Sequence, residues 1–409
     1  MSTPIANSRA RWTRFTKPRA ILAMVSLAHA VNHAYATLMP LIYPAIVTEF
    51  KLSYTDLGVM VGAANAVSGL MQMSFGYLRR FVERRVMLGG GQVLMGISAA
   101  ITGVAANFPI FFAGNLLARV GGSPQHPVGS SILSDQFDAR RRGLALSAHI
   151  SGGNFGTVLV PIIGTLVITS LGWRAALFIF AALATVIGLL IALTIDENKT
   201  ITTEPIVRGQ HTTWADIKQI LSNRNIQLLF IISTIAAGGR GLGVVITYVP
   251  LYLDKVLKIE PTLAGILFTL LLVGSVIGPV IFGRFSDARG RRPILIICYA
   301  AATFFTILFT TLGATTWLLP VTLFWMGVTV YAESPLLQTF LADAAQNLNR
   351  DLAFGLYFTA TFGIGSFWAS ALGWVIDNFG FVAGFDVMAA TYVIAALFVF
   401  PTREVRALR

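Results

Sequence analysis

The stretch Gly283-Arg-Phe-Ser-Asp-Ala-Arg-Gly-Arg-Arg292 is a compact basic loop between two apolar runs without a charged residue, 264–282 and 294–312. Each run is long enough to cross a bilayer, which takes about 20 residues. A short basic loop between two such runs is typical of a cytoplasmic hairpin of a membrane protein. The stretch Gly76-Tyr-Leu-Arg-Arg-Phe-Val-Glu-Arg-Arg85 shows the same arrangement 207 residues earlier, so the chain carries a duplication.

The composition predicts a polytopic membrane protein. Of the 409 residues, 55% are hydrophobic and 12% are charged, whereas about a quarter of a soluble protein is charged. The net charge is +12, and most Lys and Arg residues lie in the terminal segments and the even-numbered loops. This asymmetry predicts a multi-pass protein of a bacterial inner membrane with both termini cytoplasmic, and no nucleic-acid partner.

The sequence contains none of the enzyme motifs that we searched for. It has no phosphate-binding glycine loop, no G-x-S-x-G and no His and carboxylate pair at metal-ligand spacing. The single cysteine, Cys298, lies in an apolar run and excludes an intramolecular disulfide and a cysteine metal cluster. We therefore expect no enzyme, no cofactor and no metal site.

Twelve membrane spans fit the apolar pattern. They are predicted near 20–44, 55–78, 86–106, 108–133, 143–170, 173–195, 225–253, 262–285, 293–313, 316–341, 352–377 and 380–400. A polar linker, 196–224, divides the chain into two halves of six spans, 1–195 and 225–409. Within it, Thr213-Trp-Ala-Asp216 is similar to a capping box and predicts a short helix on the cytoplasmic surface.

The basic loops carry a family resemblance. G-x-x-x-D-x-x-G-R-R between the second and third spans of a six-span half resembles the signature loop of the major facilitator superfamily. The second copy has all its residues, and the first departs from it at Arg80, where the acid belongs and Glu83 offers a substitute. The resemblance implies an all-α fold of twelve transmembrane helices in two six-helix pseudo-repeats, with a substrate site between the halves that is reached by alternating access. It also implies a conformational latch formed by Gly76, Arg84, Arg85, Gly283, Asp287, Gly290, Arg291 and Arg292; the alternative is a basic loop that serves topology only.

Polar residues inside spans are costly and mark functional sites. They concentrate in the first and fourth spans of each half, which the resemblance makes the walls of the central cavity. The predicted substrate-binding residues are His29, Asn32, His33, Arg119, Arg240 and Glu333. Two arginines and the histidines outnumber the one carboxylate, so the pattern favours an anionic substrate, because guanidinium groups match oxyanions.

Each of these residues also has a structural interpretation. Arg240 and Glu333 could form a bridge between spans, Arg119 could serve proton coupling, and the span-one residues could be packing contacts. Proton-carrying candidates are Glu333, His33, His126 and His149, the last two as a proton exit in the cytoplasmic thirds of spans four and five.

Three segments resemble a narrower branch, the fosmidomycin-resistance-type efflux proteins. They are Ser26-Leu-Ala-His-Ala-Val-Asn-His33, Gly121-Gly-Ser-Pro-Gln-His-Pro127 and a span-five segment that contains Gly152-Gly-Asn-Phe-Gly156. His33 stands where the branch has an Asp. The same span is similar to the antiporter signature of the superfamily through Gly152, Gly153, Asn154, Gly156, Pro161 and Gly164, with Val160 in place of a glycine.

The sequence thus predicts a monomeric secondary transporter in the lipid bilayer. The leading hypothesis is proton-coupled efflux, by antiport, of a small anionic compound such as a phosphonate-type drug or metabolite, which would give drug resistance. Two alternatives stay open. One is an uptake symporter or exchanger of an organic anion or phosphorylated metabolite, and the other is a non-transporting membrane sensor.

Overall fold

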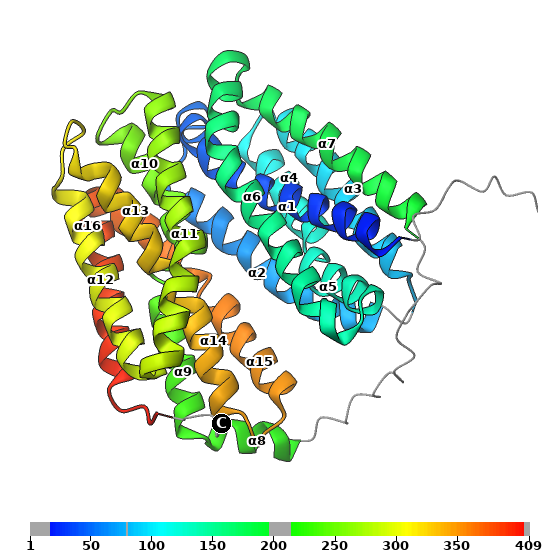
Figure 1. The fold of residues 1–409 in the computed structure, drawn as a ribbon. Helices are drawn as coiled ribbons and strands as arrows, with labels where there is room; N and C mark the ends of the chain where they lie inside the picture. Colours follow the sequence, from blue (N-terminus) through cyan, green and yellow to red (C-terminus); the bar gives the residue numbers. More distant parts are fainter. Residues whose placement is uncertain (1–16, 79–80, 196–213, 405–409) are drawn as a thin grey trace, which may run out of the picture.

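The computed structural model describes residues 17–78, 81–195 and 214–404. Figure 1 shows the N-terminal helices, blue to green, as one group and the C-terminal helices, green to red, as a second group beside it. The first group comprises α1 (Pro18–Glu49), α2 (Tyr54–Leu78), α3 (Arg84–Gly103), α4 (Phe108–Gly122), α5 (Gln125–Gln136), α6 (Ala139–Leu171) and α7 (Trp173–Thr194). The short helix α8 (Trp214–Ser222) precedes the second group; Thr213, the predicted first residue of its cap, lies outside the described residues.

The second group contains the remaining helices. They are α9 (Arg224–Ala236), η1 (Gly241–Val245), α10 (Ile246–Lys255), α11 (Pro261–Arg289), α12 (Arg291–Thr311), α13 (Leu318–Val330), α14 (Glu333–Ala344), α15 (Arg350–Phe358), η2 (Thr359–Ile364) and α16 (Phe367–Val399). In the described chain, eight helical stretches are long and apolar enough to cross a membrane, and the last of them, Leu352–Val399, holds two predicted spans. The helix α2 and two broken segments, α4–α5 and α13–α14, complete the set. The predicted all-α fold of twelve spans in two six-span repeats is confirmed.

Several spans are broken near their middle. Span four ends as α4 at Gly122 and restarts as α5 at Gln125, because Pro124 has no backbone N–H to continue the helix. Span seven is interrupted at η1, where Gly243 has φ +103°, a conformation that glycine adopts without strain. Spans 11 and 12 meet inside α16 at Gly380, whose φ is +86°. The breaks in spans four and seven lie next to the cavity described below.

The bundle has two ends, which we name by the segments that lie there. The linker end carries the start of α1, the end of α7, the helix α8 and the end of α16, and the far end carries the loops after α1, α3 and α10. At the far end the halves are joined by hydrogen bonds from Tyr54 and Thr55, at the start of α2, to Asp377 of α16. Lys255 Nζ also donates to Thr48 Oγ1, at 2.9 Å.

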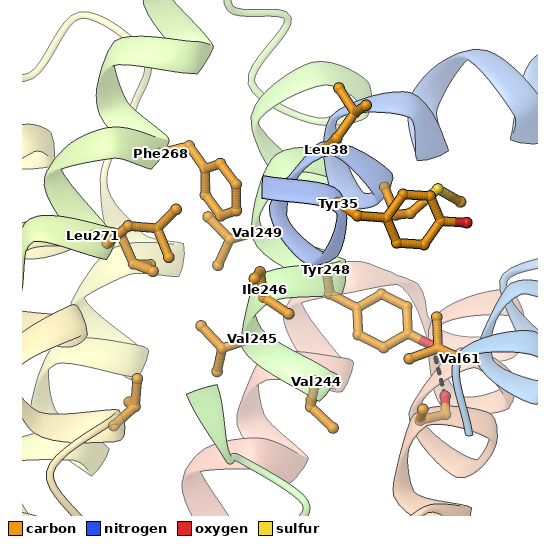
Figure 2. Close-up of a cluster of buried hydrophobic side chains, with 14 of the residues drawn as sticks. Tyr35, Leu38, Val61, Val244, Val245, Ile246, Tyr248, Val249, Phe268 and Leu271 are labelled. Atoms are coloured by element: carbon orange, nitrogen blue, oxygen red, sulfur yellow. Dashed lines mark hydrogen bonds between the residues drawn. The ribbon is translucent and has the colours of Figure 1, made fainter. Parts of the chain in front are cut away.

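Apolar side chains of both halves pack together between these contacts and the cavity. Figure 2 shows Tyr35 and Leu38 of α1 beside Tyr248 and Val249 of α10. The Tyr248 hydroxyl donates to the Ala369 carbonyl of α16, at 2.6 Å. Backbones of the two halves also touch, since a Cβ on Gly58 of α2 would overlap that carbonyl. The far end is therefore the side on which the halves are held together.

Candidate functional site

A cavity of about 310 Å³ lies between the two halves. Its walls come from α1, α2, α3, α4, α5 and α6 on one side and from the segment after α9, η1, α10, η2 and the start of α16 on the other. None of the described residues that line it is acidic. Its polar lining consists of Asn32, His33, Tyr35, Thr37, Tyr43, Asn65, Ser68, Arg119, Ser123, His126, Thr157, Arg240, Thr247, Thr361 and Ser366.

Arg119 brings an unbalanced positive charge to this cavity. It lies in the last turn of α4 and is half-buried. Within the described chain, its Nε is buried without a hydrogen-bond partner and no carboxylate lies within 4.0 Å of its guanidinium. A buried cation without a partner is costly, so the site favours an anion that would bind it.

Arg240, by contrast, is already paired. Its Nε donates to Glu333 Oε1 at 2.7 Å, and its Nη2 donates to the Ser233 carbonyl at 2.9 Å. Tyr299 donates its hydroxyl to Glu333 Oε2 at 3.0 Å, so both carboxylate oxygens accept a hydrogen bond. Arg240 occupies this place because α9 has already ended at Ala236 and the backbone of Arg240 is extended, with φ −61° and ψ 137°, before η1 begins at Gly241. The arginine lines the cavity, but Glu333 balances its charge.

The position of Glu333 differs from the sequence-based expectation, which placed it in the cavity. The side chain is 1% exposed and lies behind Arg240, outside the lining. Span ten is interrupted after Val330, and Glu333 opens the new helix α14. Pro335, in the first turn of α14, marks this interruption in the sequence, but it does not show where the Glu333 side chain points. The cavity consequently has no carboxylate to offset Arg119 among its described residues.

Four histidines form one cluster beside the cavity. The His29 ring lies 4.5 Å from that of His33, 4.8 Å from that of His126 and 4.2 Å from that of His149, between ring centroids. His33 and His126 line the cavity, whereas His29 is buried behind them. His126 and His149, the expected proton exit, thus lie against the span-one histidines, and their role in proton transfer stays a prediction.

Hydrogen bonds fix the remaining span-one residues. His29 Nδ1 lies 2.9 Å from the His149 carbonyl, and His33 Nδ1 lies 2.9 Å from Thr157 Oγ1. Asn32 Nδ2 donates to the Gly122 carbonyl at 2.9 Å, so it ties α1 to the end of α4 while it lines the cavity. Thr157 is a site residue that the sequence did not indicate, because its role depends on the packing of α6 on α1.

The similarity to known proteins agrees with this architecture. The profile of the Major Facilitator Superfamily matches residues 25–260 and 241–409, which together span nearly the whole chain. The chain belongs to the major facilitator superfamily. It is therefore a multi-pass membrane transporter that acts on a small molecule in a lipid bilayer.

Three similar proteins illustrate the range of the superfamily around this chain. The fosmidomycin resistance protein of Escherichia coli (strain K12) is 25% identical over 97% of this chain and 96% of its own length. The membrane sensor protein UhpC of the same organism is 23% identical over 94% of this chain and 91% of its own. The crystal structure of a bacterial homologue of the human lysosomal transporter Spinster, inward-facing and unoccupied, matches with a TM-score of 0.76 at 17% identity, over 94% of this chain and 96% of that one.

Within each half, arginines of the signature loop form ion pairs with acidic residues. Arg291 donates to Asp287 and, through Nε, to Asp343 of α14 at 2.9 Å. In the first half, Arg84 pairs with Asp135 of α5 at 2.5 Å, and Arg85 pairs with Glu83 at 2.5 Å. Sequence reasoning missed Asp135 and Asp343, which lie far from the loops along the chain.

The other predicted latch residues have separate surroundings. Gly290 has φ +102°, and the Glu404 carboxylate accepts from the backbone nitrogens of Arg291 and Arg292, at 2.6 and 2.9 Å. A Cβ on Gly283 would have no atom of the described residues within 4 Å, so no described helix packs against this glycine. Gly76 lies in α2, but its surroundings, like Arg80 altogether, lie outside the described residues. A latch that holds the two halves in one conformation stays a prediction.

The antiporter-like glycines of α6 face α1. A Cβ on Gly156 would overlap the Ala30 carbonyl, and one on Gly153 would lie 2.8 Å from the His29 ring. Gly152 faces Ser26 and Gly164 faces Leu38, so the four glycines form one flat packing surface. Pro161 lies inside α6 with its carbonyl toward Gly265 of the other half, and Asn154 is half-buried. This surface brings α6 close enough to α1 for the histidine cluster to form.

Proposed function

We propose that this transporter exports a small anionic compound in exchange for protons, by alternating access of the halves 1–195 and 225–409 around the linker 196–224. The observation that carries the proposal is Arg119, a cation without an acidic partner among the described residues, in a cavity whose described lining holds no acid. A guanidinium presents several donors that match a carboxylate or a tetrahedral oxyanion. The similarity to a fosmidomycin resistance protein supports a phosphonate-type compound as the cargo.

The histidines that line the cavity are the proposed proton carriers. His33 and His126 belong to the cavity wall, and imidazole changes its charge near neutral pH. In the proposed exchange the proton and the anion load alternately: the cavity returns from the external side with a protonated imidazole and no anion, and the imidazole releases its proton before the next anion binds Arg119 for export. Such coupling needs no carboxylate in the cavity. Glu333 enters the cycle only if Arg240 moves away from it.

The linker end is the proposed cytoplasmic side. The far-end contacts of Asp377 and Lys255 then close the external side, and the cavity of the described conformation belongs to an inward-facing state. The fold similarity to an inward-facing Spinster homologue supports this orientation. Both termini are proposed to be cytoplasmic, in a bacterial inner membrane.

Transport by everted membrane vesicles with a pH-sensitive dye tests the proposal. We expect phosphonates, fosmidomycin first, to move protons in wild-type vesicles. Arg119→Ala should weaken the apparent affinity about 10- to 100-fold, because a hydrogen bond to a charged group contributes about 1.5–3 kcal/mol. The matched control is Arg174→Ala, an exposed arginine at the far end that pairs with Glu49.

Two results would contradict parts of the proposal. Transport of a compound without proton movement would remove the antiport. Unchanged affinity in Arg119→Ala would remove Arg119 as the anion site.

Growth distinguishes the proposed exporter from an importer, and flux in vesicles distinguishes it from a sensor. An exporter protects cells from a toxic phosphonate, whereas an uptake symporter or exchanger of an organic anion or phosphorylated metabolite sensitises them. A sensor is favoured by the similarity to a membrane sensor protein, and it would bind the anion without any flux in vesicles.

A further inference from the structure

The histidine cluster has the composition of a transition-metal site. One ring nitrogen from each of His29, His33 and His126 lies within 4.8 Å of the others. The three residues come from two helices, α1 and α5, and His29 is buried while His126 is exposed toward the cavity. Nitrogens that bind one tetrahedral ion at about 2.0–2.1 Å lie about 3.3 Å apart, so small rotations of the rings would complete the site.

Hydrogen bonds orient two of these rings as in metal centres. His29 Nδ1 faces the His149 carbonyl, an acceptor, so Nδ1 carries the proton and Nε2 keeps its lone pair. This Nε2 is buried and has no hydrogen-bond partner among the described residues. A metal-binding histidine almost always donates its other N–H to such a carbonyl. A buried imidazole with a free lone pair is the state that a metal ion requires.

The second ring is held in the same way. His33 Nδ1 lies 2.9 Å from Thr157 Oγ1, and the Thr157 hydroxyl donates onward to the Gly153 carbonyl at 3.4 Å. The threonine oxygen therefore accepts from His33 Nδ1–H, and the Nε2 lone pair of His33 is free. His126 shares no hydrogen bond with another described side chain, so its ring can turn toward an ion.

We propose that His29, His33 and His126 bind one divalent first-row transition-metal ion, such as Zn²⁺, Co²⁺ or Ni²⁺, on the cavity wall. Imidazole suits these ions, and three protein ligands leave a coordination position open. His33 and His126 line the cavity, so the open position faces it. With three neutral ligands and no acid in the described lining, the ion keeps its double charge and draws an anion into the cavity as its next ligand.

Titration with Co²⁺ tests the site directly. The full-length protein is purified without a histidine tag and reconstituted in nanodiscs, and visible absorption reports the coordination of Co²⁺ by imidazole. We expect one Co²⁺ per chain. His126→Ala should weaken binding at least about tenfold, since even the loss of a hydrogen bond behind a ligand costs about 10- to 100-fold. Thr157→Val, which removes the bond to His33, should weaken binding about tenfold, and Thr157→Ser should restore it.

The fifth histidine provides a matched control. His211 belongs to the linker, outside the described residues, and His211→Ala should bind Co²⁺ as the wild type does. His149→Ala keeps the carbonyl that orients His29 and should also retain the metal. Azide added to the Co²⁺ form should shift its absorption, because one position is open.

The proposal fails if the wild type binds no Co²⁺ at one per chain, or if His126→Ala and Thr157→Val bind it unchanged. Loss of binding in His149→Ala with full binding in His126→Ala would refute the ligand set. An unchanged spectrum with azide would refute the open position. None of these results depends on transport. Because a bound ion blocks protonation of His33 and His126, the metal-bound form and the proton-carrying form are alternative states of the same histidines.

Discussion

The carboxylate of Asp377 accepts hydrogen bonds from both the backbone nitrogen and the hydroxyl of Thr55, at 2.8 and 2.6 Å, although the residues are 322 positions apart. The other carboxylate oxygen accepts from the Tyr54 nitrogen at 2.8 Å. The first N–H groups of a helix have no partner within it, and a negative charge is favourable there. One half of the transporter thus supplies the N-terminal cap for α2 of the other half.

Removal of this cap should favour opening of the far end. Asp377→Ala loses hydrogen bonds to a charged group, and a loss of about 1.5 kcal/mol shifts the ratio of closed to open forms about tenfold. Spin labels at Val104→Cys and Val256→Cys, in a Cys298→Ala background, report the distance between the halves at that end. We expect a longer and broader distance distribution than in the wild type.

The control for this experiment is a cap that stays within one half. Asp56 accepts from the backbone and hydroxyl of Ser53, at 3.0 and 2.6 Å, three residues away. Asp56→Ala should leave the distance between the halves unchanged. If Asp377→Ala gave the wild-type distribution, the cap would not contribute to closure.

The buried pair of Arg240 and Glu333 should dominate the stability of the second half. Glu333→Ala leaves the arginine buried without a countercharge, which costs about 3–5 kcal/mol. The double variant Arg240→Met/Glu333→Leu removes both charges and should recover most of that loss. Thermal unfolding of the purified protein in detergent measures each change.

An exposed pair offers the comparison. Arg174 and Glu49 lie 2.6 Å apart, but their side chains are 40% and 38% exposed. Glu49→Gln should change the stability by less than about 1 kcal/mol. A double variant that unfolds as early as Glu333→Ala would show that the cost lies in packing and not in the uncompensated charge.

Close packing of α6 on α1 should depend on Gly156. Gly156→Ala places a Cβ against the Ala30 carbonyl, and such overpacking costs about 1–3 kcal/mol. Gly143→Ala lies in the same helix with open space around it and should be neutral or slightly stabilising. Thermal unfolding and size-exclusion profiles distinguish them. Equal unfolding temperatures would mean that the helices adjust without cost.

The twelve spans, the duplication and the signature loops could be predicted because hydropathy, basic loops and glycine spacing are local features of the sequence. The placement of Glu333 was not predicted: Pro335 marks the start of a new helix at this point of span ten, but a proline alone does not show which side chain then faces the cavity. Local sequence patterns thus predict the membrane spans, whereas the interruptions within spans determine where a side chain such as that of Glu333 points.

The histidine cluster could not be predicted either, because its residues are far apart in the sequence. His126 and His149 lie far along the chain from His29, and their positions predicted only that they lie in the cytoplasmic thirds of spans four and five. The break at Ser123-Pro124 and the glycine surface of α6 bring them to α1. Both causes are visible in the sequence, but their effect depends on how three helices pack.

Arg291 joins the signature loop to span ten, and removal of its side chain should lower the stability of the protein. The guanidinium reaches Asp287, Asp343 and the Ser286 hydroxyl, and Asp343 is only 14% exposed. Arg291→Ala leaves that carboxylate without its partner and should lower the stability by about 1.5–3 kcal/mol. Arg289→Ala removes a charge from the same loop, where the side chain stacks on Phe285, and should change the stability by less than about 1 kcal/mol.

A second substitution tests whether the lost pairing is the cause. If the uncompensated Asp343 charge is what destabilises Arg291→Ala, then Asp343→Asn in that background removes the charge and should restore part of the unfolding temperature. If the losses of stability of the two single variants add up in the double variant, Arg291 instead stabilises the protein through its contacts within the loop. Because Arg84 pairs with Asp135 at the corresponding place of the first half, the same cycle there should show coupling of the same sign.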